Sequence, residues 1–298
     1  MPEQLADTIL NLMPRHSQSH TVAQPLPGVT LFTSDCSVTR CPNVYDPRLC
    51  FIARGRKSVF VGDKSFDYDQ NHYLLNSVTM PVEFELEKTD RQRPFVGLSL
   101  DLNDQILGPL LSQMNNSQAQ NTSDNTDTLQ AAPMTERLHE ALLRLLGLAE
   151  DPDAASVLSE GIWREIYFEV LRGPSGKLLY NRAANDFRAN RLAPVIDFID
   201  QNFEQKLDIE TIAAFANMSP STLHEHFKQV TALSPMQYLK NLRLHRAHAM
   251  ILAGQPVNQA CFAVGYQSPS QFSREFKRFF GLPPSEASVA NYTEGAMV

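Results

Sequence analysis

A segment in the C-terminal third of the chain occurs twice, 49 residues apart, and this repeat constrains the fold more than any other feature. Ser219-Pro220-Ser221 returns as Ser268-Pro269-Ser270, and seven of the 17 positions that align from there are identical. Each Ser-Pro step is a helix start, because a serine oxygen caps the first turn and proline suits its first position. Two copies of one helical unit at a fixed spacing indicate one task performed twice.

A shorter segment of helical periodicity precedes each copy, at 209–216 and at 257–264, so each copy is predicted to be a helix-turn-helix unit. One isolated unit would favour an ordinary helical hairpin. The helix expected between the two units, Pro235 to Ala253, has 19 residues. Its length of about 28 Å approaches the roughly 34 Å between successive major grooves on one face of DNA. The spacing therefore predicts that one chain reads two adjacent grooves.

The charge distribution is uneven along the chain. The formal net charge is -7, yet Ala216 to Gly281 carries seven Lys and Arg residues against two Glu. An acidic body with a local basic region is typical of selective phosphate contact. A merely solvated, charged helix face explains the same charges equally well.

Several other functional classes lack their sequence signals. No apolar run is long enough to span a bilayer, and the four cysteines show no zinc spacing, which favours reduced thiols in the cytoplasm. No partner histidine accompanies His72 in the predicted strands, so we expect neither a metal nor a cofactor there. Neither a catalytic triad nor a phosphate-binding glycine loop is present.

The first hundred residues have the pattern of a β domain. Six short apolar runs bounded by turn residues predict strands, at Val29–Thr33, Leu49–Arg54, Ser58–Gly62, Tyr73–Leu75, Val82–Leu86 and Phe95–Leu100. Such a series predicts a closed barrel or a double-sheet roll. Helical periodicity follows from Asp104, and all of the chain after Leu192 is predicted to be helical.

The second unit resembles a known family. The run Val264–Gly281, VGYQSPSQFSREFKRFFG, is similar to the AraC/XylS type of DNA-binding domain, and the resemblance spans about 192–286. It implies a transcription regulator that reads two adjacent segments of the major groove. The region 27–111 resembles the N-terminal domain of AraC-type regulators through Val44–Cys50, Gly55–Lys57 with Gly62-Asp63, and Tyr73–Val82.

Together these patterns predict an α+β protein: an N-terminal cupin-like β-barrel with helices, then an all-α domain of two helix-turn-helix units joined by a long helix. We expect a cupin-like sensor domain with a helical extension over 1–181, a linker over 182–191 and the DNA-binding domain over 192–298.

Helix geometry selects the residues that face DNA. In the two second helices Leu223, Phe227, Phe272 and Phe276 are expected to face inward. The candidate DNA-binding residues are Ser219, Ser221, Thr222, His224, Glu225 and Lys228 in the first unit and Ser268, Ser270, Gln271, Arg274, Lys277 and Arg278 in the second. Gln271 is suited to adenine and Arg274 to guanine, while Lys228, Lys277, Arg278 and the capped helix starts at Ser219 and Ser268 suit phosphates.

Glu225 departs from the basic or neutral residue that the family usually has there. Its carboxylate either accepts a hydrogen bond from cytosine or weakens the first unit by repelling phosphates. We therefore hypothesise that the second unit, through Gln271 and Arg274, carries more of the specificity.

Three cysteines lie close together near the first strands. Cys36, Cys41 and Cys50 form a candidate thiol sensor, because Arg40 beside Cys41 can lower a thiol pKa. Small buried apolar side chains are the alternative interpretation. Cys261 is expected in the core of the second unit.

The function that these features favour is an effector-responsive, sequence-specific transcription regulator and not an enzyme. Its expected partners are promoter DNA, RNA polymerase, a small-molecule effector and a second copy of the chain. We expect it in the cytoplasm, associated with the nucleoid and not with a membrane. Two alternatives stay open. One is a cupin-like enzyme with a helical accessory domain, and the other is an interaction protein whose repeat no longer grips DNA.

Overall fold

The computed structural model of the 298-residue chain describes residues 2–14, 20–87, 89–90, 92–114, 128–183 and 192–287. Its N-terminal part holds ten strands in the described residues. Their bounds are β1 His20–Leu26, β2 Val29–Ser34, β3 Val38–Tyr45, β4 Arg48–Arg54, β5 Arg56–Val61, β6 Lys64–Asp69, β7 His72–Asn76, β8 Met80–Leu86, β9 Phe95–Asp101 and β10 Leu129–Pro133. The six runs that the sequence predicts as strands are β2, β4, β5, β7, β8 and β9, so those predictions are confirmed.

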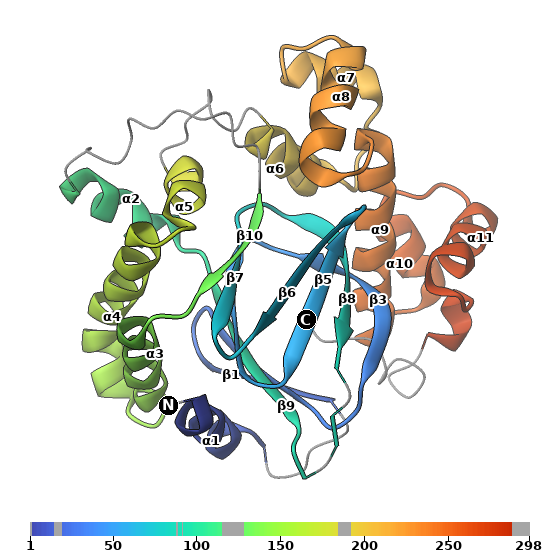
Figure 1. Ribbon diagram of the computed structural model, residues 1–298. Helices are drawn as coiled ribbons and strands as arrows, with labels where there is room; N and C mark the ends of the chain where they lie inside the picture. The colour runs from blue at the N-terminus through green and yellow to red at the C-terminus, as the bar shows by residue number, and fades with distance from the viewer. Residues whose placement is uncertain are drawn as a thin grey trace.

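The described strands form two antiparallel sheets. The six-stranded sheet has the order β1-β2-β9-β4-β7-β10, and the four-stranded sheet has the order β3-β8-β5-β6 (Figure 1). The α+β class is confirmed. Because the two sheets stay separate and do not close, the double-sheet roll describes this domain and the closed barrel does not.

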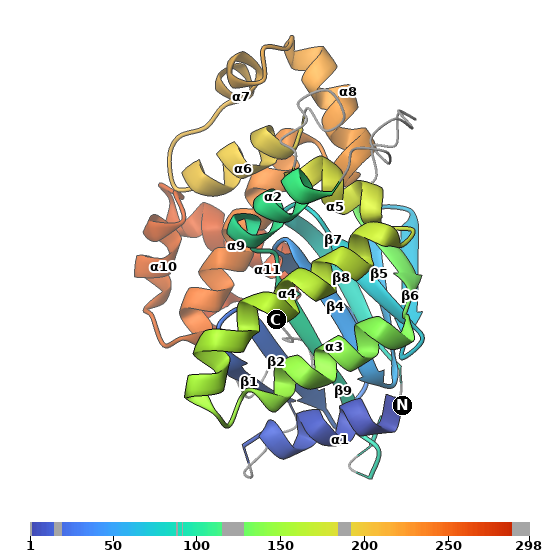
Figure 2. The same cartoon turned by 90° about the vertical axis from the view of Figure 1, so that its left-hand side faces the viewer.

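The central strands of the six-stranded sheet are buried on both faces. Helices α1 Pro2–Leu12, α3 Glu136–Gly147 and α4 Pro152–Arg172 cover one face (Figure 2), where Leu49 and Phe51 pack. The alternate residues Cys50 and Ile52 point to the other face and pack against the second sheet. This explains the uninterrupted apolar sequence of β4, since a strand covered on both faces has no solvent side. Two further helices complete this region, α2 Asp104–Gln113 and α5 Gly176–Ala183.

Six α-helices follow residue 192 in the part of the chain that the structure describes, as predicted. They are α6 Ala193–Asn202, α7 Ile209–Phe215, α8 Pro220–Thr231, α9 Pro235–Leu252, α10 Val257–Ala263 and α11 Pro269–Phe280, with a short 3-10 turn at Pro284–Glu286. Helices α7 and α8 form the first helix-turn-helix unit, and α10 and α11 form the second. Their second helices bury Leu223, Phe227, Phe272 and Phe276, which confirms the predicted inward faces.

The long helix α9 joins the two units. Its 18 residues give a length of about 27 Å at 1.5 Å per residue. A full capping box fixes its start: Ser234 Oγ accepts from the Gln237 amide at 3.3 Å, and Gln237 Oε1 accepts from the Ser234 amide at 3.2 Å. The buried residues of α9 are not confined to one stripe, because other elements pack on several of its sides.

The predicted linker at 182–191 starts inside α5. Arg182 donates to the Ser77 carbonyl at 2.7 Å and to Asp104 Oδ2 at 2.9 Å, so it is anchored to the N-terminal part. The rest of that segment, 184–191, lies outside the described residues. The domain boundaries stay predictions.

The second unit has its own core, which includes two histidines of α9. His245 and His248 pack against Phe276, Phe279 and Phe280, and both are buried. Burial lowers the pKa of His245 to about 3 and that of His248 to about 4. Both side chains are therefore neutral in the folded protein at neutral pH.

We expect these two histidines to make the protein less stable in acid. As the pH falls below about 6.5, the unfolded chain binds protons that the folded chain does not, so the free energy of unfolding decreases. The slope is up to about 1.4 kcal/mol per histidine per pH unit, down to the folded pKa. Urea unfolding between pH 7 and pH 5 measures it. The variant H245L/H248L should flatten the slope, whereas H224Q, which alters an exposed histidine, should leave it unchanged. An equal slope in all three proteins would contradict the assignment.

Candidate nucleic-acid interface

Helix α8 presents its polar face to solvent. Ser219 caps the helix by accepting from the Thr222 amide at 3.2 Å. The side chains of Ser221, His224 and Glu225 are exposed. The predicted residues of the first unit, Ser219, Ser221, Thr222, His224, Glu225 and Lys228, thus lie together on α8, all exposed.

Helix α11 is the counterpart in the second unit. Ser268 is its cap and accepts from the Gln271 amide at 3.3 Å. It is partly buried, and the other predicted residues, Ser270, Gln271, Arg274, Lys277 and Arg278, are exposed. Each capping serine accepts a hydrogen bond from only one backbone amide of its helix. The other amides of the first turn therefore remain suited to binding a phosphate.

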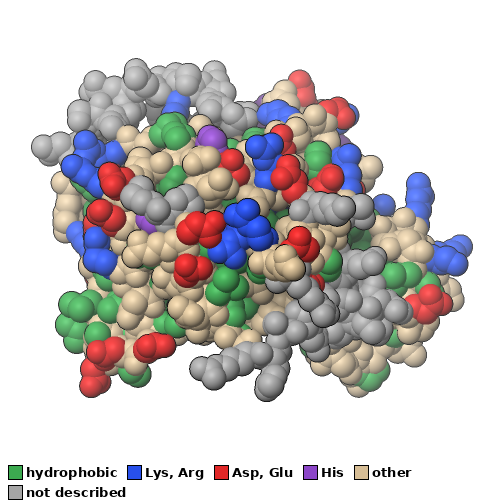
Figure 3. Space-filling model, turned by 60° about the horizontal axis from the view of Figure 1, so that its bottom comes forward, with side chains coloured by type: hydrophobic (Ala, Val, Ile, Leu, Met, Phe, Trp, Pro, Cys, Tyr) green, Lys and Arg blue, Asp and Glu red, His purple; other side chains and the backbone are tan. Residues whose placement is uncertain are grey.

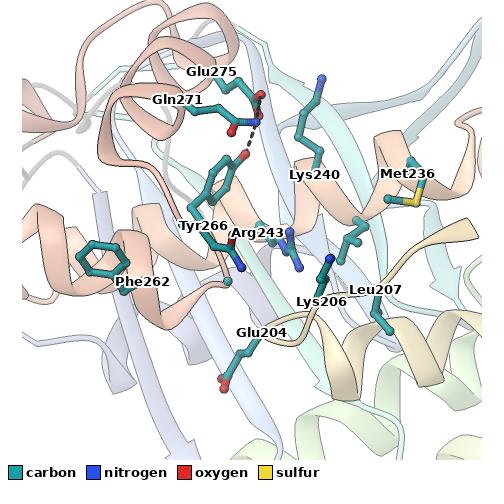
Figure 4. A pocket seen from close by; sticks show the side chains of 13 residues that line it. Glu204, Lys206, Leu207, Met236, Lys240, Arg243, Phe262, Tyr266, Gln271 and Glu275 are labelled. Atoms are coloured by element: carbon teal, nitrogen blue, oxygen red, sulfur yellow. Dashed lines mark hydrogen bonds between the residues drawn. The ribbon is translucent and has the colours of Figure 1, made fainter. Parts of the chain in front are cut away.

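Two intramolecular hydrogen bonds orient the predicted reading residue Gln271. Its Nε2 donates to Glu275 Oε1 at 3.0 Å, and Tyr266 donates from its hydroxyl to Glu275 Oε2 at 2.7 Å (Figure 4). Arg274 Nε donates to the Ser270 carbonyl at 3.3 Å. Glu275 and Tyr266 were not among the residues predicted from sequence, although a glutamate four residues after a glutamine on a helix is a pairing signal.

A cleft of about 540 Å³ separates the two units on one side of α9. Its walls come from the segment between α6 and α7, from α9, from α10 and from α11 (Figure 4). Arg243 of α9 donates to the carbonyls of Phe203 and Gln205, both at 2.7 Å. Gly265 has φ +86°, and a Cβ atom there would lie 2.5 Å from the Glu204 carbonyl oxygen, so only glycine fits this turn. These contacts hold the segment between α6 and α7 against α9 and the turn before α11.

The first unit docks on the β domain through α9. Tyr238, which is fully buried, donates from its hydroxyl to the Thr79 carbonyl at 2.6 Å. Arg246 forms ion pairs with Asp200 at 3.0 Å and with Asp46 of the β domain at 3.4 Å. One continuous apolar cluster runs from the space between the two sheets into the first unit, whereas the second unit has a separate cluster.

The tip of the β5–β6 hairpin also touches the first unit. Gly62 has φ +60°, and a Cβ atom there would lie 2.4 Å from Cβ of Ala232. Ala232 ends α8 in the left-handed region, with φ 59°. The hairpin therefore meets the C-terminal end of α8, while the candidate DNA-binding residues Ser219 to Glu225 lie toward its start and stay exposed.

The three candidate thiol-sensor cysteines have different environments. Burial raises the pKa of Cys41 to about 12 and also raises the pKa of Cys50, which opposes thiolate formation at both. Cys36 is partly exposed, and its Sγ lies 3.2 Å from Nε2 of His20. The sensor hypothesis stays a prediction, and Cys36 fits it better than the two buried thiols. Cys261 is fully buried in the second unit, as expected.

Two further features bear on function. In the part of the chain that the structure describes, no group of three His, Cys, Asp or Glu side chains is placed to hold a metal, and no helix is long and apolar enough to cross a membrane. On the face shown in Figure 3, basic and acidic side chains are interspersed and form no continuous basic surface.

The fold and the candidate interface define a class of protein with a double-sheet domain followed by paired helix-turn-helix units. Comparison with known proteins supports the same two-part organisation. Residues 25–178, just over half of the chain, match the family described as the AraC-type transcriptional regulator N-terminus, and residues 212–288 match the helix-turn-helix domain family. The chain therefore belongs to the AraC family of transcription regulators.

Individual relatives show the same relationship. The chain is 31% identical over 154 residues to the transcriptional activator RhaS of Escherichia fergusonii, covering 51% of this chain and 53% of RhaS. It is 29% identical over 92 residues to the lactose operon transcription activator of Staphylococcus xylosus, covering 30% of this chain and 33% of that protein. The chain thus spans about half the length, or less, of these curated relatives.

A solved structure shares the whole fold. ToxT of Vibrio cholerae O395 superposes with a TM-score of 0.62 at 12% identity, covering 93% of this chain and 100% of ToxT. Another ToxT structure, from strain SCE256, gives a TM-score of 0.62 at 12% identity over 92% of this chain and 96% of that chain. At this identity the likeness concerns the fold alone.

We expect the two helix caps to stabilise the interface. Replacing Ser219 or Ser268 with alanine leaves an amide of the first helical turn without its acceptor, which should lower the free energy of unfolding by about 1 kcal/mol. Urea denaturation measures the loss. Ser285→Ala, at an exposed serine outside both helices, is the control and should change nothing. A cap variant as stable as this control would show that the serine is not an effective cap.

Proposed function

We propose that the protein is a sequence-specific regulator of transcription that reads two adjacent major-groove segments of double-stranded DNA. The observation that carries this proposal is the pair of capped helices, α8 and α11, whose polar faces are exposed. Helix α8 precedes α9, and α11 packs against the second half of α9. The length of α9, about 27 Å, is close to the roughly 34 Å repeat of the groove.

The residues in contact with DNA are proposed to be those that the sequence selects. Gln271 and Arg274 of α11 read base edges, since glutamine pairs with adenine and arginine with guanine. Lys228, Lys277 and Arg278 hold phosphates. Glu225 of α8 is an exposed carboxylate on the same surface, so the first unit contributes less affinity than the second.

A small effector bound in the double-sheet domain controls the regulator. ToxT, which shares the fold, has been solved with a bound unsaturated fatty acid and with a naphthalenyl-butenoic acid, which supports a small-molecule site in this architecture. The continuous apolar cluster and the Tyr238 contact supply a physical link from the sheets to α9.

The remaining assignments follow from this role. The relatives are named activators, which supports RNA polymerase as a partner and the cytoplasmic nucleoid as the location. A second copy of the chain is the other proposed partner. The proposed role involves no catalysis. The two alternative functions, a cupin-like enzyme and an interaction protein that does not bind DNA, are distinguished from it by the next experiment.

The test is DNA binding measured by fluorescence anisotropy, with a fragment selected from a random-sequence library. Specific binding that weakens with salt supports the regulator, because phosphate contacts release counterions. Absence of binding at every salt concentration contradicts it and leaves the two alternatives.

Substitution of the proposed reading residues ranks the two units. Arg274→Ala should weaken specific binding by about 5- to 150-fold and relax the preference at one base pair, the effect of losing one bidentate contact. His224→Ala in the first unit should have a smaller effect. If R274A left binding intact while H224A or a Ser221 variant abolished it, the ranking would be reversed. Lys228→Ala serves as the matched phosphate variant and should weaken all sequences alike, with a salt slope reduced by about 1.

A further inference from the structure

A lysine lies in the interior of the double-sheet domain, where charged side chains are rare. Lys57 is only 2% exposed. It occupies β5, in which exposed and buried residues alternate, so its side chain points inward together with those of Val59 and Val61. Lys57 was not predicted from sequence to have a role, although its position in phase with two inward-facing valines is visible in the strand pattern.

Aromatic rings from both sheets surround the ammonium group. Its nitrogen lies 4.4 Å from the ring centre of Phe84, 5.2 Å from that of Tyr45 and 5.5 Å from that of Phe32. Phe32 belongs to the six-stranded sheet, and the other two rings belong to the four-stranded sheet. The rings offset part of the loss of hydration.

The ammonium group has no oxygen partner among the described residues. Neither a hydrogen bond nor an ion pair joins Lys57 to another described side chain. The nearby cation Arg48 is already placed 3.7 Å from both Asp46 and Asp101. Burial lowers the pKa of Lys57 to about 8, so the group is still mainly protonated at neutral pH. Buried cations in proteins are normally paired with an anion.

Two buried hydroxyl groups lie beside Lys57. Tyr68 stands directly opposite Lys57 in the β5–β6 register, so both side chains are on one face of the sheet. The hydroxyls of Tyr68 and Tyr45 are buried and interact with each other, and that of Tyr68 also with the Cys50 thiol, but neither has an anionic acceptor within the described part of the chain. Both tyrosines are at most 2% exposed. One ammonium and two hydroxyls therefore lie together, without an anionic acceptor, in a largely apolar surrounding.

We propose that Lys57, with Tyr45 and Tyr68, forms the subsite that binds the carboxylate of the effector, whose remaining part is apolar or aromatic. A carboxylate supplies the anionic acceptor that this cluster lacks, and the surrounding rings suit an apolar body. The proposal rests on the proposed function only in assuming that the double-sheet domain binds an effector. Tyr45 is adjacent to Asp46, the partner of Arg246 on α9, which places the subsite next to the interdomain contact.

The test compares carboxylates with neutral counterparts of the same shape. Calorimetry measures the binding of 1-naphthaleneacetate against 1-naphthaleneacetamide, and of decanoate against decanamide, to the full chain without DNA. At least one carboxylate should bind about ten-fold or more tightly than its amide, the effect of one charge-assisted hydrogen bond. Lys57→Met should abolish this preference. Lys64→Met, at the exposed end of the same hairpin, should retain it. Tyr68→Phe should reduce carboxylate affinity several-fold.

Thermal unfolding without any probe separates a ligand subsite from a structural lysine. K57M should unfold at a higher temperature than the wild type, because an apolar chain of similar size replaces a buried charge without an anionic partner. A lower midpoint, a preference retained in both K57M and Y68F, or no preference for either carboxylate in the wild type would overturn the proposal. None of these results involves DNA, so the anisotropy experiment still decides the proposed function by itself.

Discussion

The burial of α9 on several sides is the interaction on which the rest of this structure depends. Residues in its first half, such as Tyr238 and Leu242, belong to the apolar cluster that extends between the sheets. Residues in its second half, such as Ala247 and Ile251, belong to the core of the second unit. One helix therefore fixes the separation of the two units and joins one of them to the β domain. The two copies of the repeat are unequal in their surroundings as well as in their exposed residues.

This asymmetry gives the two units different physical roles. The first unit shares its core with the domain proposed to bind the effector, and the Arg246–Asp46 pair and the Gly62–Ala232 contact lie at the same junction. A change in the packing between the sheets can reach α8 through buried contacts. The second unit has a separate apolar cluster, and Arg243 of α9 is bonded to the segment between α6 and α7. The second unit carries the proposed reading residues Gln271 and Arg274.

How much could be predicted from sequence depended on burial. The six predicted strands lie inside the sheets, whereas the four that were missed, β1, β3, β6 and β10, are the four sheet edges. An edge strand pairs on one side only, so it tolerates Pro25, Pro42 and the charged residues of β6, and its apolar signal is weak. The exposed faces of α8 and α11 were predictable, because helical period alone determines them. The Tyr238 contact and the Lys57 cluster join distant segments, and no local pattern encodes which residues will meet.

The central claim is that one chain holds two reading helices about one turn of DNA apart. Hydroxyl-radical footprinting of the full chain on a fragment selected from a random library tests it most directly. The account predicts two protected regions on one face of the duplex, with centres about one helical turn apart. In R274A, protection of the region bound by α11 should decrease more than protection of the region bound by α8. A single protected region of one groove width, or two regions on opposite faces of the duplex, would contradict the account.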